Sequence, residues 1–424
     1  MLDIKFILEN KDLIDLGAKK KHIKFDVSEL IALDATRREL TAKTDAKRAE
    51  QNAFSQKIVG VADHTLKMSM ITEMKIVKED LEKAEAELKT ILKKWQTLML
   101  QVPNIPDMSV PEGASDADNK EVKTWGEKPT FTFPAKGHIE LMQNLDMADF
   151  DRGTKVAGFR GYFLKNDGAL LSLAIWQYAM DFFLKRDFSP MIVPSLVRRE
   201  TLFGTGYLPQ GEEDLYKTQD DDFLAGTGEV ATMAFHSDEV LEQKDLPKKY
   251  LAFSPCFRRE AGSHGKDVKG LIRVHEFFKV EQVVLCEASH TESVAQHEAV
   301  NRNTEEFIES LGIPYHTVVN CGGDLGLGQV KKYDIELWVP NENTYREISS
   351  ASYFHDFQTR RLNIRYRDSL GKMRYAHSLN STAIPTPRIL VSLVENFQQA
   401  DGSILIPQVL QKYMGGKTVI AKKV

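Results

Sequence analysis

The chain has 424 residues, of which 42% are hydrophobic, 28% charged and 9% aromatic, a mixture typical of a soluble globular protein with a large core. At roughly 150 residues per domain, this length predicts two or three domains. The net charge of -5, from 56 basic and 61 acidic residues, means that a nucleic-acid partner would need a local basic patch.

The cysteines and the hydropathy exclude several further classes of protein. Cys256, Cys286 and Cys321 form no CxxC pair, so we expect neither a disulfide framework nor a zinc site. A reducing cytoplasm is the compartment this pattern favours. Nowhere do about 18 consecutive apolar residues occur, and we expect no membrane anchor or export signal.

Residues 70–102 carry a sustained heptad pattern, which predicts a long helix packed along a partner. The apolar stripe consists of Met74, Val77, Leu81, Ala84, Leu88, Ile91, Trp95, Leu98 and Val102. Residues 27–58 continue the register with a weaker seam, because Arg37, Thr44, Lys47 and Gln51 interrupt it. A polar connection at 60–67 would reverse the chain, so residues 1–102 predict an antiparallel coiled-coil arm with helices roughly 45 Å long.

Two further features of the arm bear on its packing and its partners. Alanines at 42, 46, 49 and 53 form an adjacent stripe, where we expect the second helix to approach closely. The outward faces are rich in basic residues: Lys43, Lys47, Arg48, Lys57, Lys75, Lys78, Lys83, Lys89, Lys93 and Lys94. Acidic residues are interleaved, so a solvated coiled-coil face accounts for this pattern, and nucleic-acid contact is the alternative.

A change of composition marks the start of a second part of the chain. Residues 103–134 hold five of the fifteen prolines and the polar run EGASDADNKE, which predicts a linker. In residues 135–424, helical stretches such as ALLSLAIWQYAMDFFL alternate with β-rich runs such as KKYLAFSPCF and YDIELWV. This alternation predicts one α+β domain.

Residues 251–285 predict a strand, a glycine-punctuated loop and a second strand. Side chains alternate along a strand, so Arg258 and Glu260 would share one face of the first strand. One face of the second strand would carry Arg273, His275, Phe277, Lys279 and Glu281. This alignment favours the floor of a polar cleft, with a water-exposed sheet face as the alternative. The loop, with Gly262, Gly265, Gly270, Lys266 and Lys269, suits phosphates.

The run NSTAIPTPRILVSLVENFQQ, residues 380–399, predicts a buried helix with Thr386 as N-cap and Pro387 at its first position. Arg388 would then lie at a positive helix end, where a guanidinium favours a bound phosphate. An interface ion pair is the equal alternative. Two glycine-rich runs, GGDLGLGQ at 322–329 and GGKT at 415–418, fail the spacing of a P-loop.

Taken together, these segments resemble a class II aminoacyl-tRNA synthetase, and specifically the seryl-tRNA synthetases of bacterial type. DFSPMIVPSL, with Pro194, resembles motif 1 of that class, FRREAGSHGKDVKGLIRVHEFFKVE resembles motif 2, and the stretch ending in Arg388 resembles motif 3. The arm resembles the family's antiparallel coiled coil.

The resemblance implies a six- or seven-stranded antiparallel sheet flanked by helices and a homodimer built around motif 1. It also implies a reaction in which ATP and L-serine form seryl-adenylate and the seryl group passes to tRNA(Ser), and also to tRNA(Sec). The alternatives are a paralogue that acts on another amino acid or on a carrier protein, and a non-catalytic RNA-binding derivative.

The family's nucleotide site maps onto ten residues of this chain: Arg258, Arg259, Glu260, Val274, Phe277, Glu347, Ile348, Ser349, Ser350 and Arg388. Arg258 and Arg388 match the catalytic arginines that hold the α-phosphate and the γ-phosphate. Phe277 would stack on adenine. Glu347 and Ser350 match ligands of Mg²⁺, which would reach them through ATP.

The family's amino-acid pocket maps onto Thr227, Gly228, Glu229, Arg258, Glu281, Asn380 and Thr382. Two stretches depart from the commonest bacterial pattern. The serine loop reads TGE where TAE is usual, and motif 3 reads STAIPTPR in place of a glycine-rich run. Ala351 and Tyr353 also stand where Cys and Asn are frequent.

Overall fold

The computed structural model describes residues 1–262, 265 and 267–422, so Lys266 of the predicted phosphate loop lies outside the described residues. The chain divides into two compact units. The first contains residues 1–19 and 23–103, and the second contains residues 20–22 and 104–424. No helix in the described part of the chain is long and apolar enough to cross a membrane. The three cysteines are free and buried.

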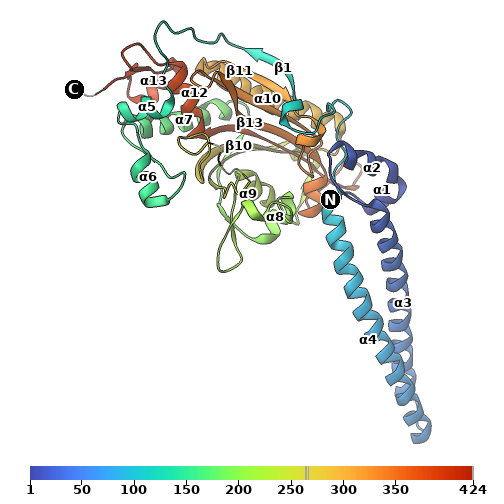
Figure 1. Cartoon of the computed structure of the whole chain (residues 1–424). Helices are drawn as coiled ribbons and strands as arrows, with labels where there is room; N and C mark the ends of the chain where they lie inside the picture. The colour runs from blue at the N-terminus through green and yellow to red at the C-terminus, as the bar shows by residue number, and fades with distance from the viewer. Residues whose placement is uncertain (263–264, 266, 423–424) are drawn as a thin grey trace. The chain divides into compact units, whose positions relative to one another are not determined.

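The first unit is a helical hairpin with two short helices at its N-terminus. Helices α3 and α4 lie side by side and run antiparallel (Figure 1). Aspartate side chains begin both: Asp26 accepts from the backbone N–H groups of Ser28 and Glu29, and Asp63 does the same at α4. The helices are α1 (Ile4–Glu9), α2 (Lys11–Lys20), α3 (Val27–Val59) and α4 (His64–Gln101). The predicted arm is confirmed, with a connection shorter than expected because Asp63 starts α4 early.

The polar residues that interrupt the α3 stripe contact the facing helix. The Arg37 guanidinium lies 4.9 Å from the centre of the Trp95 ring, and Lys47 Nζ lies 3.1 Å from a carboxylate oxygen of Asp80. The alanine stripe at 42, 46, 49 and 53 is exposed, so the expectation that it meets the second helix is wrong. Residues such as Leu40 and Leu81 form the seam instead, because the heptad pattern buries more apolar area than alanines can.

The second unit is built on a sheet of eight strands in the order β1-β11-β12-β13-β16-β10-β9-β4 (Figure 1). Every neighbouring pair is antiparallel except β4 with β9. The strands are β1 (Lys120–Trp125), β4 (Ser189–Ile192), β9 (Lys248–Phe257), β10 (Glu276–Cys286), β11 (Tyr315–Val319), β12 (Lys331–Val339), β13 (Thr344–His355) and β16 (His377–Thr386). The predicted α+β class is confirmed, and the sheet exceeds the implied six or seven strands.

Helices and short strands surround this sheet. The helices are α5 (His138–Asn144), α6 (Phe150–Ala157), α7 (Asp167–Leu184), α8 (Arg199–Thr205), α9 (Gly228–Ala234), α10 (His290–Leu311), α11 (Phe357–Arg361), α12 (Arg388–Asn396) and α13 (Gln408–Gln411). Short pairings are formed by β2 (Ala148–Asp149), β3 (Phe163–Leu164), β5 (Leu196–Val197), β6 (Tyr216–Lys217), β7 (Phe223–Leu224), β8 (Val240–Glu242), β14 (Arg365–Arg367), β15 (Met373–Tyr375), β17 (Ile404–Leu405) and β18 (Val419–Ile420).

Alternation along β10 separates the core from the polar face. Val280 and Val284 join the main hydrophobic cluster, which includes residues of α7, α10 and α12. Gln282 points the same way, since its amide donates to the Val300 carbonyl and to Thr304 of α10. Phe277, Lys279 and Glu281 therefore occupy the opposite face, as predicted for this strand.

Three local expectations differ from the structure. The predicted strands end earlier at the loop: β9 stops at Phe257 and β10 starts at Glu276, so Arg258, Glu260, Arg273 and His275 lie outside them. Helix α12 begins at Arg388 with Pro387 as N-cap, one residue later than predicted. Thr386 is instead the last residue of β16, and its hydroxyl accepts from Trp176 Nε1 at 2.7 Å.

The proline-rich segment 103–134 also contains strand β1, which pairs with β11 at the edge of the sheet. The run KEVKTW lies between the prolines, so each of its residues is free to join a ladder.

Candidate active site

Three cavities adjoin one another on the polar face of the sheet, with volumes of about 50, 430 and 630 Å³. Arg258 and Glu347 line all three, one following the end of β9 and the other on β13. In the sheet, β16 and β10 lie between β13 and β9, so the two residues approach the cavities from strands on either side of this pair. A cationic and an anionic side chain therefore stand where the three cavities join.

The 430 Å³ cavity contains most of the residues predicted to bind an amino acid. Those lining it are Thr227, Glu229, Arg258, Glu281, Asn380 and Thr382. Thr227 is the N-cap of α9, and Glu281 lies opposite Thr382 across the β10–β16 pair. Lys279 forms an ion pair with Glu281 and donates to the Thr227 hydroxyl at 2.8 Å. Apart from Arg258, which is exposed, these polar groups are nearly fully buried, so a ligand must match them with groups of its own.

Glu229 is held from two sides in this cavity. The Gln358 amide donates to its Oε1 at 2.6 Å, and the Tyr207 hydroxyl donates to its Oε2 at 3.0 Å. Burial, together with the nearby Glu281, raises the pKa of Glu229 to about 7. Glu229 can thus hold or release a proton near neutral pH, which suits a site that binds a ligand hydroxyl or ammonium.

The smallest cavity has an apolar rim. Val274, Ile348 and Phe277 line it, and the Arg258 guanidinium lies 5.3 Å from the centre of the Phe277 ring. The Phe277 ring and the Arg258 guanidinium are thus two flat groups side by side at this cavity. Glu260 is at its polar end and forms an ion pair with Arg273.

Arg388 lines the smallest and the largest cavities from the start of α12. Its Nε donates to the Ile272 carbonyl at 2.8 Å, and one terminal nitrogen donates to the Glu347 carbonyl at 3.0 Å. Burial lowers the pKa of Arg388, and the Glu347 carboxylate opposes that shift. Among the described residues no ion pair of Arg388 is formed, so its charge has no carboxylate partner within the chain.

The predicted magnesium ligands also meet in this region. Glu347 and Ser350 both line the 430 Å³ cavity, and Ser350 bonds to Asp334. Among the residues that the structure describes, no group of three or more metal-ligating side chains occurs. Two protein oxygens fit Mg²⁺ bound through ATP phosphates, since that ion retains water and substrate ligands.

Three predicted site residues lie away from the cavities. Arg259 donates from its side chain to the Glu213 carbonyl at 3.2 Å and is exposed. Ser349 is buried and donates to the Thr382 carbonyl at 2.6 Å. Gly228 lies under the pocket, where an added Cβ would meet the Ser254 hydroxyl at 3.1 Å. Any contact of these residues with a ligand would have to use the backbone or follow a rearrangement.

Several lining residues were not predicted from the sequence. Tyr207 and Lys332 reach the 430 and 630 Å³ cavities from loops and strands far from the motifs. The loop 326–329, part of a glycine-rich run rejected as a phosphate loop, forms one wall of the 430 Å³ cavity. Its two glycines, Gly326 and Gly328, are the sequence signal for this wall, because glycine lets the backbone lie close to a ligand.

Comparison with known proteins gives matches over the whole chain. Residues 1–106 match the seryl-tRNA synthetase N-terminal domain, and residues 215–397 match the class II tRNA synthetase core domain (G, H, P, S and T). The serine–tRNA ligase of Deinococcus radiodurans is 44% identical over 100% of both chains.

Two solved structures have the same fold. The seryl-tRNA synthetase of Pyrococcus horikoshii, complexed with ATP, has a TM-score of 0.90 and 37% identity over 100% of both chains. The cytoplasmic serine–tRNA ligase of Naegleria fowleri, in complex with AMP, has a TM-score of 0.87 and 32% identity, and covers 100% of this chain and 99% of its own.

Proposed function

This chain belongs to the seryl-tRNA synthetase family of class II aminoacyl-tRNA synthetases, and on that premise we propose that it activates L-serine with ATP and charges tRNA(Ser). The supporting observation is that Arg258 and Glu347 line all three cavities. A nucleotide in the smallest cavity and an amino acid in the carboxylate-lined pocket would meet at these two side chains.

The first step would form seryl-adenylate. A serine carboxylate oxygen attacks the α-phosphorus of ATP, and pyrophosphate leaves with the electrons of the broken P–O bond. Arg258 would neutralise the negative charge that grows on the α-phosphate, and Arg388 would hold the γ-phosphate. Bound Mg²⁺ would supply further charge neutralisation, with Glu347 and Ser350 as its protein ligands.

The second step would transfer the seryl group to RNA. A ribose hydroxyl at the 3′ end of tRNA attacks the carbonyl carbon, and AMP leaves. The basic side chains exposed on α3 and α4 would bind tRNA(Ser) through its phosphates and shape, with little base readout. We extend the proposal to tRNA(Sec), which the family charges with serine.

Selectivity for serine would come from buried polar groups that can bond to the substrate hydroxyl. Glu229, Glu281 and Thr382 surround the amino-acid pocket and are buried. Alanine has no hydroxyl to bond to these groups, and sites of this kind reject the analogue by roughly 10⁴- to 10⁵-fold. Threonine must be excluded by shape, since one methyl group alone is worth only about 1 to 3 kcal/mol.

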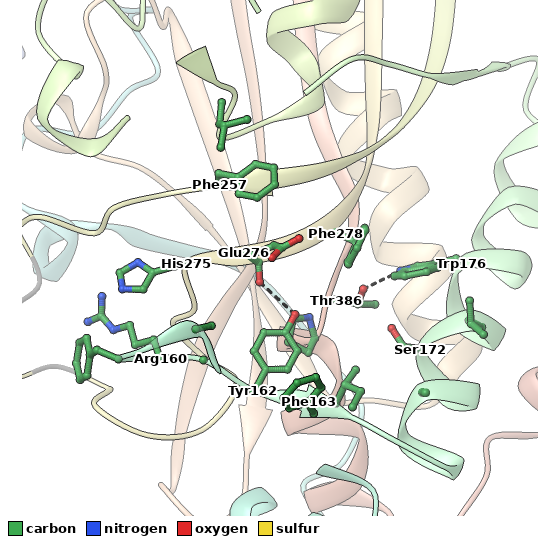
Figure 2. Close-up of a pocket in the computed structure, with 18 of the residues that line it drawn as sticks. Arg160, Tyr162, Phe163, Ser172, Trp176, Phe257, His275, Glu276, Phe278 and Thr386 are labelled. Atoms are coloured by element: carbon green, nitrogen blue, oxygen red, sulfur yellow. Dashed lines mark hydrogen bonds between the residues drawn. The ribbon is translucent and has the colours of Figure 1, made fainter. Parts of the chain in front are cut away.

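We also propose a homodimer in which a second copy covers α7. A cavity of about 580 Å³ opens beside this helix (Figure 2). Trp176 and Tyr162 line it; the first donates to Thr386 and the second to the Glu276 carbonyl. Leu170 and Leu173 of α7 are each 46% exposed, which is unusual for adjacent apolar residues on a packed helix. Sedimentation should therefore give a dimer, and Leu173→Glu should give a monomer; a wild-type monomer would contradict this.

The proposed function is tested by serine-dependent exchange of labelled pyrophosphate into ATP across a panel of amino acids. We expect serine to exceed alanine and threonine by at least about 100-fold in kcat/KM. The matched aminoacylation assay uses tRNA(Ser) and tRNA(Sec) transcripts, with tRNA(Ala) as the control. Exchange with threonine or alanine above that with serine would overturn the proposal.

A further inference from the structure

Lys21 is a buried lysine in the second unit, 3% exposed, and within the described residues it forms no ion pair with a carboxylate. Its Nζ donates to three backbone carbonyls, those of Gly326 at 3.0 Å, Leu327 at 2.9 Å and Gln329 at 2.6 Å. An ammonium has three protons and a neutral amine has two, so three carbonyl acceptors favour the charged form. Burial opposes that form and lowers the pKa of Lys21.

The three carbonyls belong to the 326–329 wall, which we define as Gly326, Leu327, Gly328 and Gln329. All four residues line the 430 Å³ amino-acid cavity. The wall contains no helix or strand, and two of its four residues are glycines. Its own sequence therefore does little to restrict its conformation.

A second residue holds the same wall. The Asn104 backbone N–H donates to the Leu327 carbonyl at 2.8 Å, and its side-chain amide donates to the carbonyls of Gly328 at 2.9 Å and Phe354 at 2.8 Å. All four wall carbonyls thus accept from Lys21 or Asn104. In the sequence these two residues stand on either side of the helical segment 23–103.

The wall is connected in turn to the strand behind the pocket. Gln329 accepts from the Gly326 N–H at 2.6 Å and donates to the Ser352 hydroxyl at 2.8 Å. Ser352 lines the cavity and lies opposite Asn380 across the β13–β16 pair. A displacement of the wall would therefore move pocket side chains on both sides of the amino-acid site.

We propose that Lys21 is a positioning residue for the amino-acid pocket, where it fixes the 326–329 wall from behind together with Asn104. This inference rests on the proposed function, because it assigns the 430 Å³ cavity to serine. It predicts weaker binding of the amino acid and unchanged binding of ATP. The 50 and 630 Å³ cavities, which contain Glu260 and Arg388, include no residue of the wall.

The test measures pyrophosphate exchange by the full chain carrying Lys21→Met, which keeps the length of the side chain and removes the ammonium. We expect the KM for serine to rise about tenfold while the KM for ATP stays within about twofold, since only hydrogen bonds to the wall are lost. Lys20→Met is the matched control, because Lys20 pairs with exposed Glu112 at 3.7 Å. It should leave both KM values unchanged.

Asn104→Ala tests the wall independently and is the deciding variant if Lys21→Met does not fold. It should raise the KM for serine in the same direction. In the double variant the KM for serine should rise by less than the product of the two single rises, because both residues hold the same segment.

Two outcomes separate this inference from the proposed function. Wild-type protein without serine-dependent exchange would overturn the proposed function. Active wild type with an unchanged serine KM in the folded variants, or with equal rises in the KM for serine and for ATP, would overturn the role of Lys21.

Discussion

The helical arm and the catalytic unit bury their side chains in different ways. In the arm, only isolated seam positions such as Leu40 and Leu81 are nearly fully buried. In the catalytic unit, large side chains such as Phe183, Phe307 and Tyr315 are completely buried in one cluster. The arm therefore presents most of its surface to solvent, whereas the catalytic unit has a large core beneath a few polar groups.

The difference extends to the charged residues. Pairs across the arm, such as Arg48 with Glu85 at 2.7 Å, are exposed and contribute little stability each. In the catalytic unit, Lys279 and Glu281 are nearly inaccessible and face a cavity. Removal of a single exposed charge from the arm should have a small effect, while removal of one from the pocket leaves an unpaired buried partner.

The largest expected effect is that of Arg258→Ala on pyrophosphate exchange. Removal of a guanidinium that lines all three cavities should lower kcat/KM by about 10³-fold, as for other groups that stabilise developing charge. Arg259→Ala is the matched control. Its side chain contacts the Glu213 carbonyl outside the cavities, so we expect a change below about threefold. Equal losses of kcat/KM in both variants would contradict a specific role of Arg258 in the reaction.

A second pair of variants compares stability in the two regions. Leu393→Ala in α12 removes a side chain that is 0% exposed, and Leu81→Ala in α4 removes one that is 5% exposed. We expect the free energy of unfolding to fall by about 3 to 5 kcal/mol in Leu393→Ala and by about 2 to 3 kcal/mol in Leu81→Ala. The second loss is smaller because the arm collapses more easily around a cavity. Urea denaturation followed by circular dichroism measures both. Serine-dependent exchange should survive Leu81→Ala, and its loss there would contradict the separation of roles.

A further expected effect is the pH dependence contributed by Glu229. Because burial raises its pKa to about 7, the folded protein keeps a proton there that the unfolded chain has already released. Stability should fall as the pH rises from the ordinary range of glutamate to about 7, and remain level above it. In Glu229→Gln, the slope of the free energy of unfolding against pH should lose the contribution of one proton. The exposed control Glu79→Gln should leave that slope unchanged. An unchanged slope in Glu229→Gln would show that Glu229 titrates normally.

Local patterns in the sequence predicted the arm and the polar face of β10. Heptad spacing determines the seam of α3 and α4, and alternation places Phe277, Lys279 and Glu281 on one face of β10. Strand ends were predicted less well. The chain leaves the ladder at Phe257 and turns at Glu260, whose φ of 55° no alternation rule anticipates.

Contacts between distant segments could not be predicted from the pattern. Lys21 reaches the Gly326 carbonyl across 305 residues of sequence, and nothing around position 21 distinguishes this lysine from its neighbours Lys19 and Lys20. The Trp176–Thr386 bond at the end of β16 is of the same kind. Only the three-dimensional arrangement reveals which lysine or threonine has a fixed partner.

The central claim is that the catalytic unit activates serine and the arm selects the RNA. The most direct test deletes residues 28–100, joins the ends with a short glycine linker, and measures exchange and aminoacylation on the same preparation. We predict that serine-dependent exchange stays within about threefold of wild type while charging of tRNA(Ser) falls by at least about 10³-fold, because the phosphate contacts of the arm are lost. Equal loss of both activities, or full retention of charging, would contradict the claim.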